Sequence, residues 1–153
     1  MLNSPFNSRL QISISVISHS LLVVLLFISC APQSAYFSPV AYEQATSLKV
    51  DSLSLMNKAT EPYENYEEDV QALLNRIEKA YEYAKGRPNN EYTTAQWEIM
   101  KAPDRNLLGG FMYRWKKQEK LNQVFIDEAK HIISDAYDTI IGLESHKIKP
   151  PNE

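Results

Sequence analysis

The chain has 153 residues, a net charge of −3, and 44% hydrophobic and 23% charged residues. This length fits one ordinary domain, and the composition excludes wholesale disorder. The weakly acidic balance gives no electrostatic reason to expect nucleic acid as a partner. The single cysteine excludes an internal disulfide, CxxC redox chemistry and a cysteine-rich zinc site.

The N-terminal residues have the pattern of a secretory signal peptide. Residues 1–9 are polar and carry one positive charge, Arg9, and no acid. The stretch 21–28, LLVVLLFI, is purely apolar, and the small residues 29–31 follow it. A basic start, a short apolar block and a small-residue junction are typical of signal peptides. The block of 8 residues is too short to cross a hydrocarbon core of about 30 Å as a helix.

The sequence FISC at the end of this block resembles the lipobox of bacterial lipoproteins. Phe27 stands where Leu is commonest, the small Ser29 comes next to the cysteine, and Cys30 would be the first mature residue. The resemblance covers residues 1–31. It implies a diacylglycerol on the Cys30 sulfur, cleavage between Ser29 and Cys30, and acylation of the new amino group, for example with palmitate. Two or three acyl chains anchor a protein stably. Ala31, in place of an inner-membrane-retaining Asp, favours the outer membrane.

Two other interpretations of the segment stay open. An uncleaved anchor over residues 10–29 has the 20 residues that a spanning helix needs. Gln11, His19 and four serines weaken its apolar character. The other interpretation is a plain cleaved signal peptide without a lipid. We predict the lipoprotein organisation: a signal peptide over 1–29, a lipidated tether over 30–38, an α-helical domain over 39–146 and a polar tail over 147–153.

Two helices are predicted in the first half of the domain. Ser38 and Pro39 form an N-cap and a first helical residue, which starts a helix over 39–59. A second helix over 62–85 has the clearest apolar seam in the chain. Its members alternate steps of three and four: Tyr63, Tyr66, Val70, Leu73, Ile77, Ala80 and Ala84.

Three further helices are predicted in the second half. Thr93 opens a short helix over 94–101 through a capping box, and Asp104 caps a helix over 105–119. Gly109 and Gly110 within that helix mark a break or a close approach of another helix backbone. Asn122 caps the last helix, 123–145. Its expected core stripe is Phe125, Ala129, Ile132, Ala136, Ile140 and Leu143.

These patterns predict an all-α fold. We expect a small antiparallel bundle of three longer helices with the two shorter ones packed across it. No sustained alternating apolar pattern appears after the signal segment, so we expect almost no sheet. A domain of this size can form a core without disulfides.

Motifs for catalysis or metal binding are weak. Glu128 and His131 share a helix face and have the spacing of a metal-ligating pair. A di-iron bundle would need a second such pair, which the chain lacks, so a solvated helix face is the favoured interpretation. No catalytic residue and no cofactor are predicted, because no nucleophile elbow, phosphate-binding loop or dinucleotide motif is present.

Two groups of residues are candidates for a binding patch. The stretch RWKKQEK contains Arg114, Lys116 and Lys117, which could contact anionic lipid or a cell-wall polymer. The favoured alternative is a solvated face with Trp115 in the core. The second group, Tyr83, Tyr92 and Trp97, could form an aromatic surface that recognises protein or glycan.

Three functions are compatible with these observations. The leading hypothesis is a non-catalytic, lipid-anchored helical module that faces the periplasm or cell exterior and binds an envelope protein or a cell-wall polymer. The second is a protein that binds a small apolar ligand between helices around Phe111, Trp115 and Phe125. The third is a metal-dependent enzyme centred on Glu128 and His131. The sequence sets no oligomeric state.

Overall fold

The structure, a computed structural model, describes residues 35–150. The chain divides into two units, residues 1–32 and 33–153, and every described residue belongs to the second. The predicted signal peptide, its cleavage after Ser29 and the lipidation of Cys30 therefore lie outside the described residues. Among the helices within 35–150, none is both long and apolar enough to cross a membrane.

The domain is built from helices, and residues 35–150 contain no strand, which confirms the predicted fold class. In chain order the elements are α2 (Pro39–Met56), a 3₁₀ turn η1 (Tyr63–Tyr66), α3 (Glu67–Lys85), α4 (Glu91–Lys101), α5 (Leu108–Gln118) and α6 (Gln123–Glu144).

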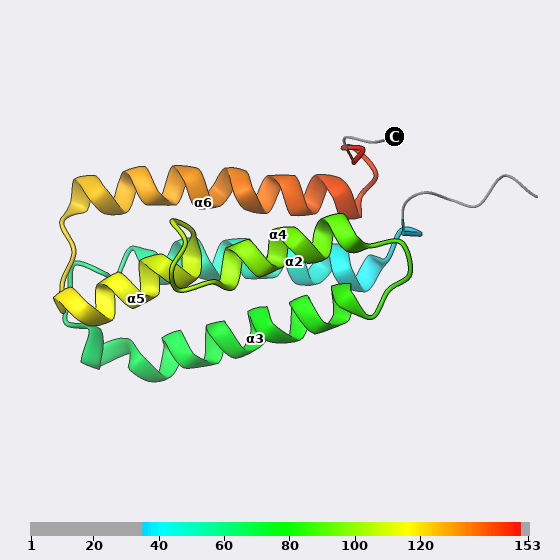
Figure 1. The fold of residues 1–153 in the computed structure, drawn as a ribbon. Helices are drawn as coiled ribbons and strands as arrows, with labels where there is room; N and C mark the ends of the chain where they lie inside the picture. Colours follow the sequence, from blue (N-terminus) through cyan, green and yellow to red (C-terminus); the bar gives the residue numbers. More distant parts are fainter. Residues whose placement is uncertain (1–34, 151–153) are drawn as a thin grey trace, which may run out of the picture. The chain divides into compact units, whose positions relative to one another are not determined.

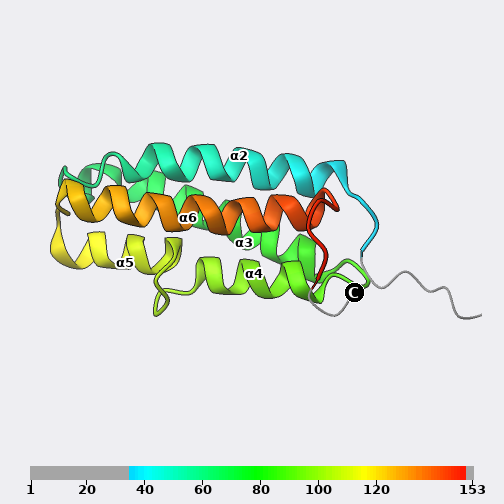
Figure 2. The same ribbon diagram turned by 90° about the horizontal axis from the view of Figure 1, so that it is seen from above.

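The helices form a bundle of four antiparallel rods. Figures 1 and 2 show that α2, α3 and α6 are three of the rods, whereas α4 and α5 lie end to end and together make the fourth. The prediction that the two short helices pack across the bundle is therefore wrong. Because α4 packs against both α3 and α6, it runs along the bundle and buries its apolar face between them.

The predicted caps hold at two helices and fail at two. The Ser38 side chain accepts a hydrogen bond from the Ala41 amide at 3.2 Å, and Asn122 accepts one from the Phe125 amide at 2.8 Å. In contrast, α4 begins at Glu91 rather than 94, and α5 begins at Leu108 rather than 105. Thr93 lies inside α4 with its side chain buried, so it cannot cap the helix.

Two helix boundaries also differ from the predicted ranges. The first helix ends at Met56 rather than 59, although Ala59 is still buried. The predicted helix over 62–85 opens with the separate turn η1 before α3 begins. This turn presents Tyr63 and Tyr66 to Trp115, with ring centroids 5.5 and 5.8 Å away.

The glycine pair marks a close backbone approach, one of the two predicted possibilities. A Cβ on Gly109 would lie 2.1 Å from the Lys101 carbonyl oxygen. Only glycine lets the first turn of α5 come this near to the last residue of α4. The start of α5 is thus fixed by contact with α4 and not by a cap from Asp104.

The core stripe predicted for the last helix is wrong by about one residue position before Ile140 and correct from there on. The fully buried side chains of α6 include Ile126, Ile133 and Tyr137, whereas Ile132 is 56% exposed. Phe125 and Ala129 are only partly buried. Ile140 and Leu143 belong to both the predicted and the observed stripe.

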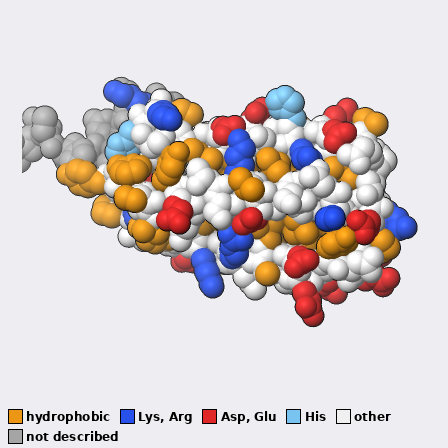
Figure 3. All heavy atoms as spheres, turned by 180° about the vertical axis from the view of Figure 1, so that it is seen from behind, with side chains coloured by type: hydrophobic (Ala, Val, Ile, Leu, Met, Phe, Trp, Pro, Cys, Tyr) orange, Lys and Arg blue, Asp and Glu red, His pale blue; other side chains and the backbone are white. Residues whose placement is uncertain are grey.

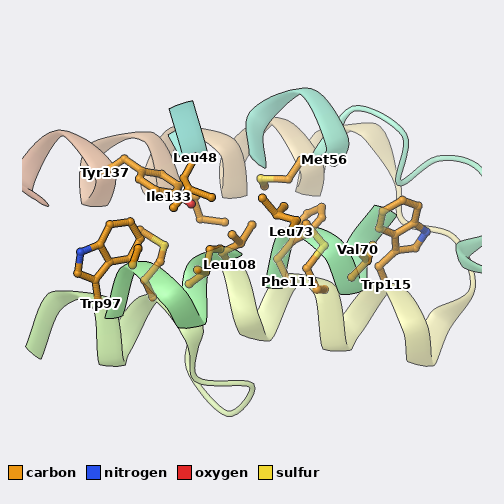
Figure 4. Close-up of a cluster of buried hydrophobic side chains, with 14 of the residues drawn as sticks. Leu48, Met56, Val70, Leu73, Trp97, Leu108, Phe111, Trp115, Ile133 and Tyr137 are labelled. Atoms are coloured by element: carbon orange, nitrogen blue, oxygen red, sulfur yellow. The ribbon is translucent and has the colours of Figure 1, made fainter. Parts of the chain in front are cut away.

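The core runs along the bundle between the rods. Figure 4 shows side chains from all four rods meeting there, among them Leu48 of α2, Leu73 of α3, Trp97 of α4 and Ile133 of α6. The buried Ser52 and Tyr137 hydroxyls form a hydrogen bond of 2.8 Å inside it. Within the described part of the chain, no fully buried side-chain polar atom lacks a partner.

Candidate functional site

A surface groove lies between α5 and α6, beside the loop that precedes α5. Its volume is about 380 Å³. Loop 103–107 forms one wall, α5 contributes Phe111 and Arg114, and α6 contributes Phe125, Glu128 and Ile132. We call it the Phe125 groove. The short turn between α5 and α6 makes these helices neighbours and so places the walls side by side.

The floor of the Phe125 groove is aromatic. The rings of Phe111 and Phe125 are stacked, with centroids 6.0 Å apart and planes 3° from parallel. The Arg114 guanidinium lies over the Phe125 ring, 4.5 Å from its centroid. This cation–π contact holds the Arg114 guanidinium over one face of the Phe125 ring.

The rim of the groove carries charges of both signs. Arg105 and Arg114 contribute guanidinium groups, and Asp104 and Glu128 contribute carboxylates. Within residues 35–150, none of these four side chains forms a salt bridge. The groove thus combines an apolar floor with a rim of charged groups that form no salt bridge within residues 35–150.

The candidate metal pair, Glu128 and His131, is not assembled into a site. Glu128 lies at the groove, whereas the His131 side chain is 81% exposed and contacts Asp135, with Nδ1 and Oδ2 3.3 Å apart. Among the residues that the structure describes, no three His, Cys, Asp or Glu side chains are grouped as metal ligands.

The basic residues of α5 point in three directions. Arg114 covers Phe125, whereas Lys116 forms a salt bridge of 2.7 Å to Glu67. This hydrogen bond raises the pKa of Lys116. Lys117 lies over the Tyr113 ring, and its hydrogen bond to that phenol raises the pKa of Lys117. The structure therefore does not gather these cations into one basic patch.

Trp115, which lies between the basic residues in sequence, is a core residue, as favoured above. It is fully buried, and its Nε1 donates a hydrogen bond to the Glu61 carbonyl oxygen at 3.0 Å. The interior around it is occupied by Tyr63 and Tyr66. Of the three aromatic residues suggested for an apolar ligand, only Phe111 and Phe125 line the groove.

The predicted aromatic patch is wrong in one member. Tyr83 and Tyr92 are partly exposed, but Trp97 is only 2% exposed and packs edge-on against Tyr137 at 5.9 Å. Tyr83 lies in the last turn of α3 and Tyr92 in the first turn of α4, at the end of the domain away from α5. The six candidate patch residues therefore do not form one surface.

A polar cluster around the buried Glu144, absent from our predictions, holds the chain just before α2. Arg87 donates hydrogen bonds to the Glu144 carboxylate and to the Tyr36 carbonyl oxygen. Glu144 is almost completely buried. His146 Nε2 lies 2.8 Å from the Ala35 carbonyl oxygen. We call these residues the tether clamp, because they fix the segment that follows the proposed lipid anchor.

No sequence rule would have found the tether clamp. Arg87 and Glu144 lie 57 positions apart, in a loop and in the last turn of α6. Only the antiparallel topology brings these two chain positions to one end of the bundle.

Comparisons of this chain with protein-family models, curated proteins and solved structures found no match.

Proposed function

We propose that this chain is a lipid-anchored bacterial envelope protein whose helical domain faces the periplasm and binds another envelope protein through the Phe125 groove. The lipid on Cys30 would hold it at a membrane, with the outer membrane favoured. In this proposal the domain is a non-catalytic binding module.

The groove is the observation that carries the binding proposal. Protein interfaces have an apolar centre and a polar rim, and aromatic residues and Arg dominate their energetic centres. The Phe111–Phe125 floor, the Arg114 guanidinium above it and the mixed charged rim match this anatomy. The expected occupant is an apolar side chain of a partner, flanked by groups that bind the rim charges.

The exposure of Ile132 favours a protein over a small apolar ligand. A small ligand in its pocket has most of its surface covered. Ile132, at the edge of the groove, is 56% exposed, and a broad partner would cover it together with the floor. One observation still supports the second candidate function, the binding of a small apolar ligand. The groove volume of about 380 Å³ falls within the range of small-molecule pockets.

The anchor is tested by mass spectrometry of the mature N-terminus from the native host. We expect a diacylated Cys30 as the first residue and loss of membrane fractionation on Cys30→Ser. An unmodified thiol on a mature protein, or a full-length Cys30→Ser product that still fractionates with membranes, would refute the lipid anchor.

The groove is tested by photo-cross-linking in cells. A photoreactive phenylalanine analogue at Ile132 should form one defined adduct with a protein, and Arg114→Glu in the same chain should abolish it. The same analogue at Val50 is the matched control, because Val50 is an exposed apolar residue on α2, which contributes nothing to the groove.

The alternative functions give different results in this experiment. Adducts that are equally strong from Val50, or unaffected by Arg114→Glu, would refute the groove as the binding surface. An adduct to glycan would identify a cell-wall polymer instead of a protein. A small apolar ligand would copurify with the unlabelled protein and be released by Phe125→Ala.

A further inference from the structure

Exposed hydrophobic side chains are concentrated at one end of the domain. Seven of the twelve exposed large hydrophobic residues in the described range lie there. They are those of segment 36–42 together with Tyr83, Tyr92 and Ile148. Figure 3 shows hydrophobic side chains gathered at this end. We call this surface the tether face.

The topology of the bundle assembles the tether face. It contains the first turns of α2 and α4 and the last turn of α3, and Ile148 follows α6. The Phe37 ring lies 6.4 Å from the rings of both Tyr42 and His146, and the Ser38 and Tyr83 hydroxyls are 2.9 Å apart. These contacts connect segment 37–42 to Tyr83, and Tyr92 and Ile148 line one pocket together with Ala35.

The tether clamp makes this face rigid at the point where the chain enters the domain. Because Arg87 and His146 bind the carbonyl oxygens of Tyr36 and Ala35, segment 35–38 is part of the folded domain. Only residues 31–34 separate it from Cys30. Five Cα–Cα steps join Cys30 to Ala35, which limits their separation to about 18 Å in a fully extended chain.

The side chains of the tether face suit the interfacial region of a bilayer. Tyrosine is enriched at membrane–water interfaces, where its ring is apolar and its hydroxyl remains hydrated. The charges nearby are balanced. Lys147 and Lys149 follow α6, whereas Glu43 lies in the second turn of α2 and Glu91 in the first turn of α4. Lys85 and Arg87 are paired with Glu82 and Glu144. Apolar contact, and not electrostatic attraction, would therefore dominate.

From these observations we infer that the tether face docks onto the lipid headgroup region of the bilayer that carries the anchor. This inference rests on the proposed lipidation of Cys30. Docking would place the Phe125 groove away from the lipid, since Ile132 and Glu144 are twelve residues apart on α6, or about 18 Å along the helix axis. The groove would then remain open to a partner in the periplasm.

The test uses the full chain, processed in a bacterial host and reconstituted in vesicles of phosphatidylethanolamine and phosphatidylglycerol. Lipidation leaves no free thiol, so one introduced cysteine takes an environment-sensitive fluorophore. Phe37→Cys probes the tether face, with Val40→Cys as a second probe in case the first does not fold. Val124→Cys, in the first turn of α6, is the control, because it is 68% exposed at the other end of α6.

Docking predicts that the labels at 37 and 40 shift to shorter emission wavelengths and are quenched by nitroxide-labelled lipid, while the label at 124 shows neither effect. Equal emission and quenching at all three positions would overturn the docking and leave the anchor intact. Shielding at 37 in native membranes but not in lipid vesicles would overturn it in favour of a protein partner. A thiol in the unsubstituted chain that reacts with the fluorophore would instead refute the anchor itself.

Discussion

At the scale of single residues, the core depends on a hydrogen-bonded pair of hydroxyl groups. Ser52 of α2 and Tyr137 of α6 are both fully buried, and their oxygens lie 2.8 Å apart. Each hydroxyl satisfies the other in a site closed to water. Leaving one of them unpaired would cost about 1–3 kcal/mol of stability.

The Tyr137 phenol makes stability depend on pH in the alkaline range. Burial raises the pKa of Tyr137 above its ordinary value of 10.0, although its hydrogen bond to Ser52 opposes the shift. Above about pH 10 the unfolded chain loses this proton while the folded chain keeps it, so the free energy of unfolding falls as pH rises. We expect urea titrations across this range to show a steeper decline for the natural chain than for Tyr137→Phe.

Tyr83→Phe is the control for this experiment. The Tyr83 ring is partly exposed on the tether face, and this substitution leaves the buried Ser52–Tyr137 hydrogen bond in place. The variant should therefore keep the steeper decline of the natural chain. Equal slopes for the natural chain and Tyr137→Phe would show that the buried phenol does not control the decline.

At the scale of elements, α6 shows why a helix pattern alone does not define its buried face. Apolar pairs such as Ile132-Ile133 and Ile140-Ile141 place hydrophobic side chains on two adjacent stripes. Both stripes satisfy the same three-and-four spacing. The helices that pack against α6, namely α2 and α4, select the stripe through Ile126, Ile133 and Tyr137.

Substitution of two neighbouring isoleucines tests this register. Ile133→Ala removes a fully buried side chain and should lower the free energy of unfolding by about 2–5 kcal/mol. Ile132→Ala changes an exposed position and should shift it by no more than about 0.5 kcal/mol. Chemical denaturation measures the free energy of unfolding of both variants. A larger loss for Ile132→Ala than for Ile133→Ala would contradict the buried face observed for α6.

The junction between α4 and α5 depends on a missing side chain. A Cβ on Gly109 would meet the Lys101 carbonyl at 2.1 Å, a backbone atom that cannot move away alone. Gly109→Ala should therefore lower the unfolding free energy by about 1–3 kcal/mol or more. Thermal unfolding would measure the loss.

Gly86→Ala is the matched control for this substitution. At Gly86 the nearest atom to an added Cβ lies 3.4 Å away, and φ is −76°, which alanine adopts freely. This variant should be neutral or slightly stabilising, because alanine restricts the unfolded chain. Equal losses at both glycines would exclude a steric origin.

At the scale of the whole molecule, the tether clamp joins three distant parts of the chain. Arg87, in the loop after α3, binds Glu144 at the end of α6 and the segment before α2. Asn90 joins this cluster to the end of α3, because its Nδ2 donates hydrogen bonds to Glu144 Oε1 at 3.5 Å and to the Ala84 carbonyl oxygen at 3.1 Å. The clamp closes one end of the bundle and holds the tether face in place.

Removing Arg87 should destabilise the fold more than removing an exposed arginine. Arg87→Met leaves the buried Glu144 carboxylate without its cation, which should cost about 3–5 kcal/mol. Arg76→Met breaks a half-exposed pair with Asp51 and should cost less than about 1 kcal/mol. Urea unfolding of the two variants checks this order, and similar losses would contradict a structural role for the clamp.

Helix content and the α3 seam were predictable from the sequence, because they depend on neighbours three and four positions apart. Val70, Leu73, Ile77, Ala80 and Ala84 are all buried as their spacing predicts. The cap at Asn122 was equally local, since its side chain bonds to an amide three residues away. For the candidate site, the small-ligand hypothesis grouped Phe111 with Phe125, and both line the groove. The same hypothesis also included Trp115, which lies in the core.

By itself, the sequence determined that the domain is a helical bundle and where most of its helices lie, because periodicity and caps act within a few residues. Only the tertiary structure decided which stripe of α6 faces the core, that α4 and α5 share one rod, and that Arg87 reaches Glu144. These features depend on contacts between residues tens of positions apart, where several partners satisfy the same local pattern and only the packing of complete helices selects one.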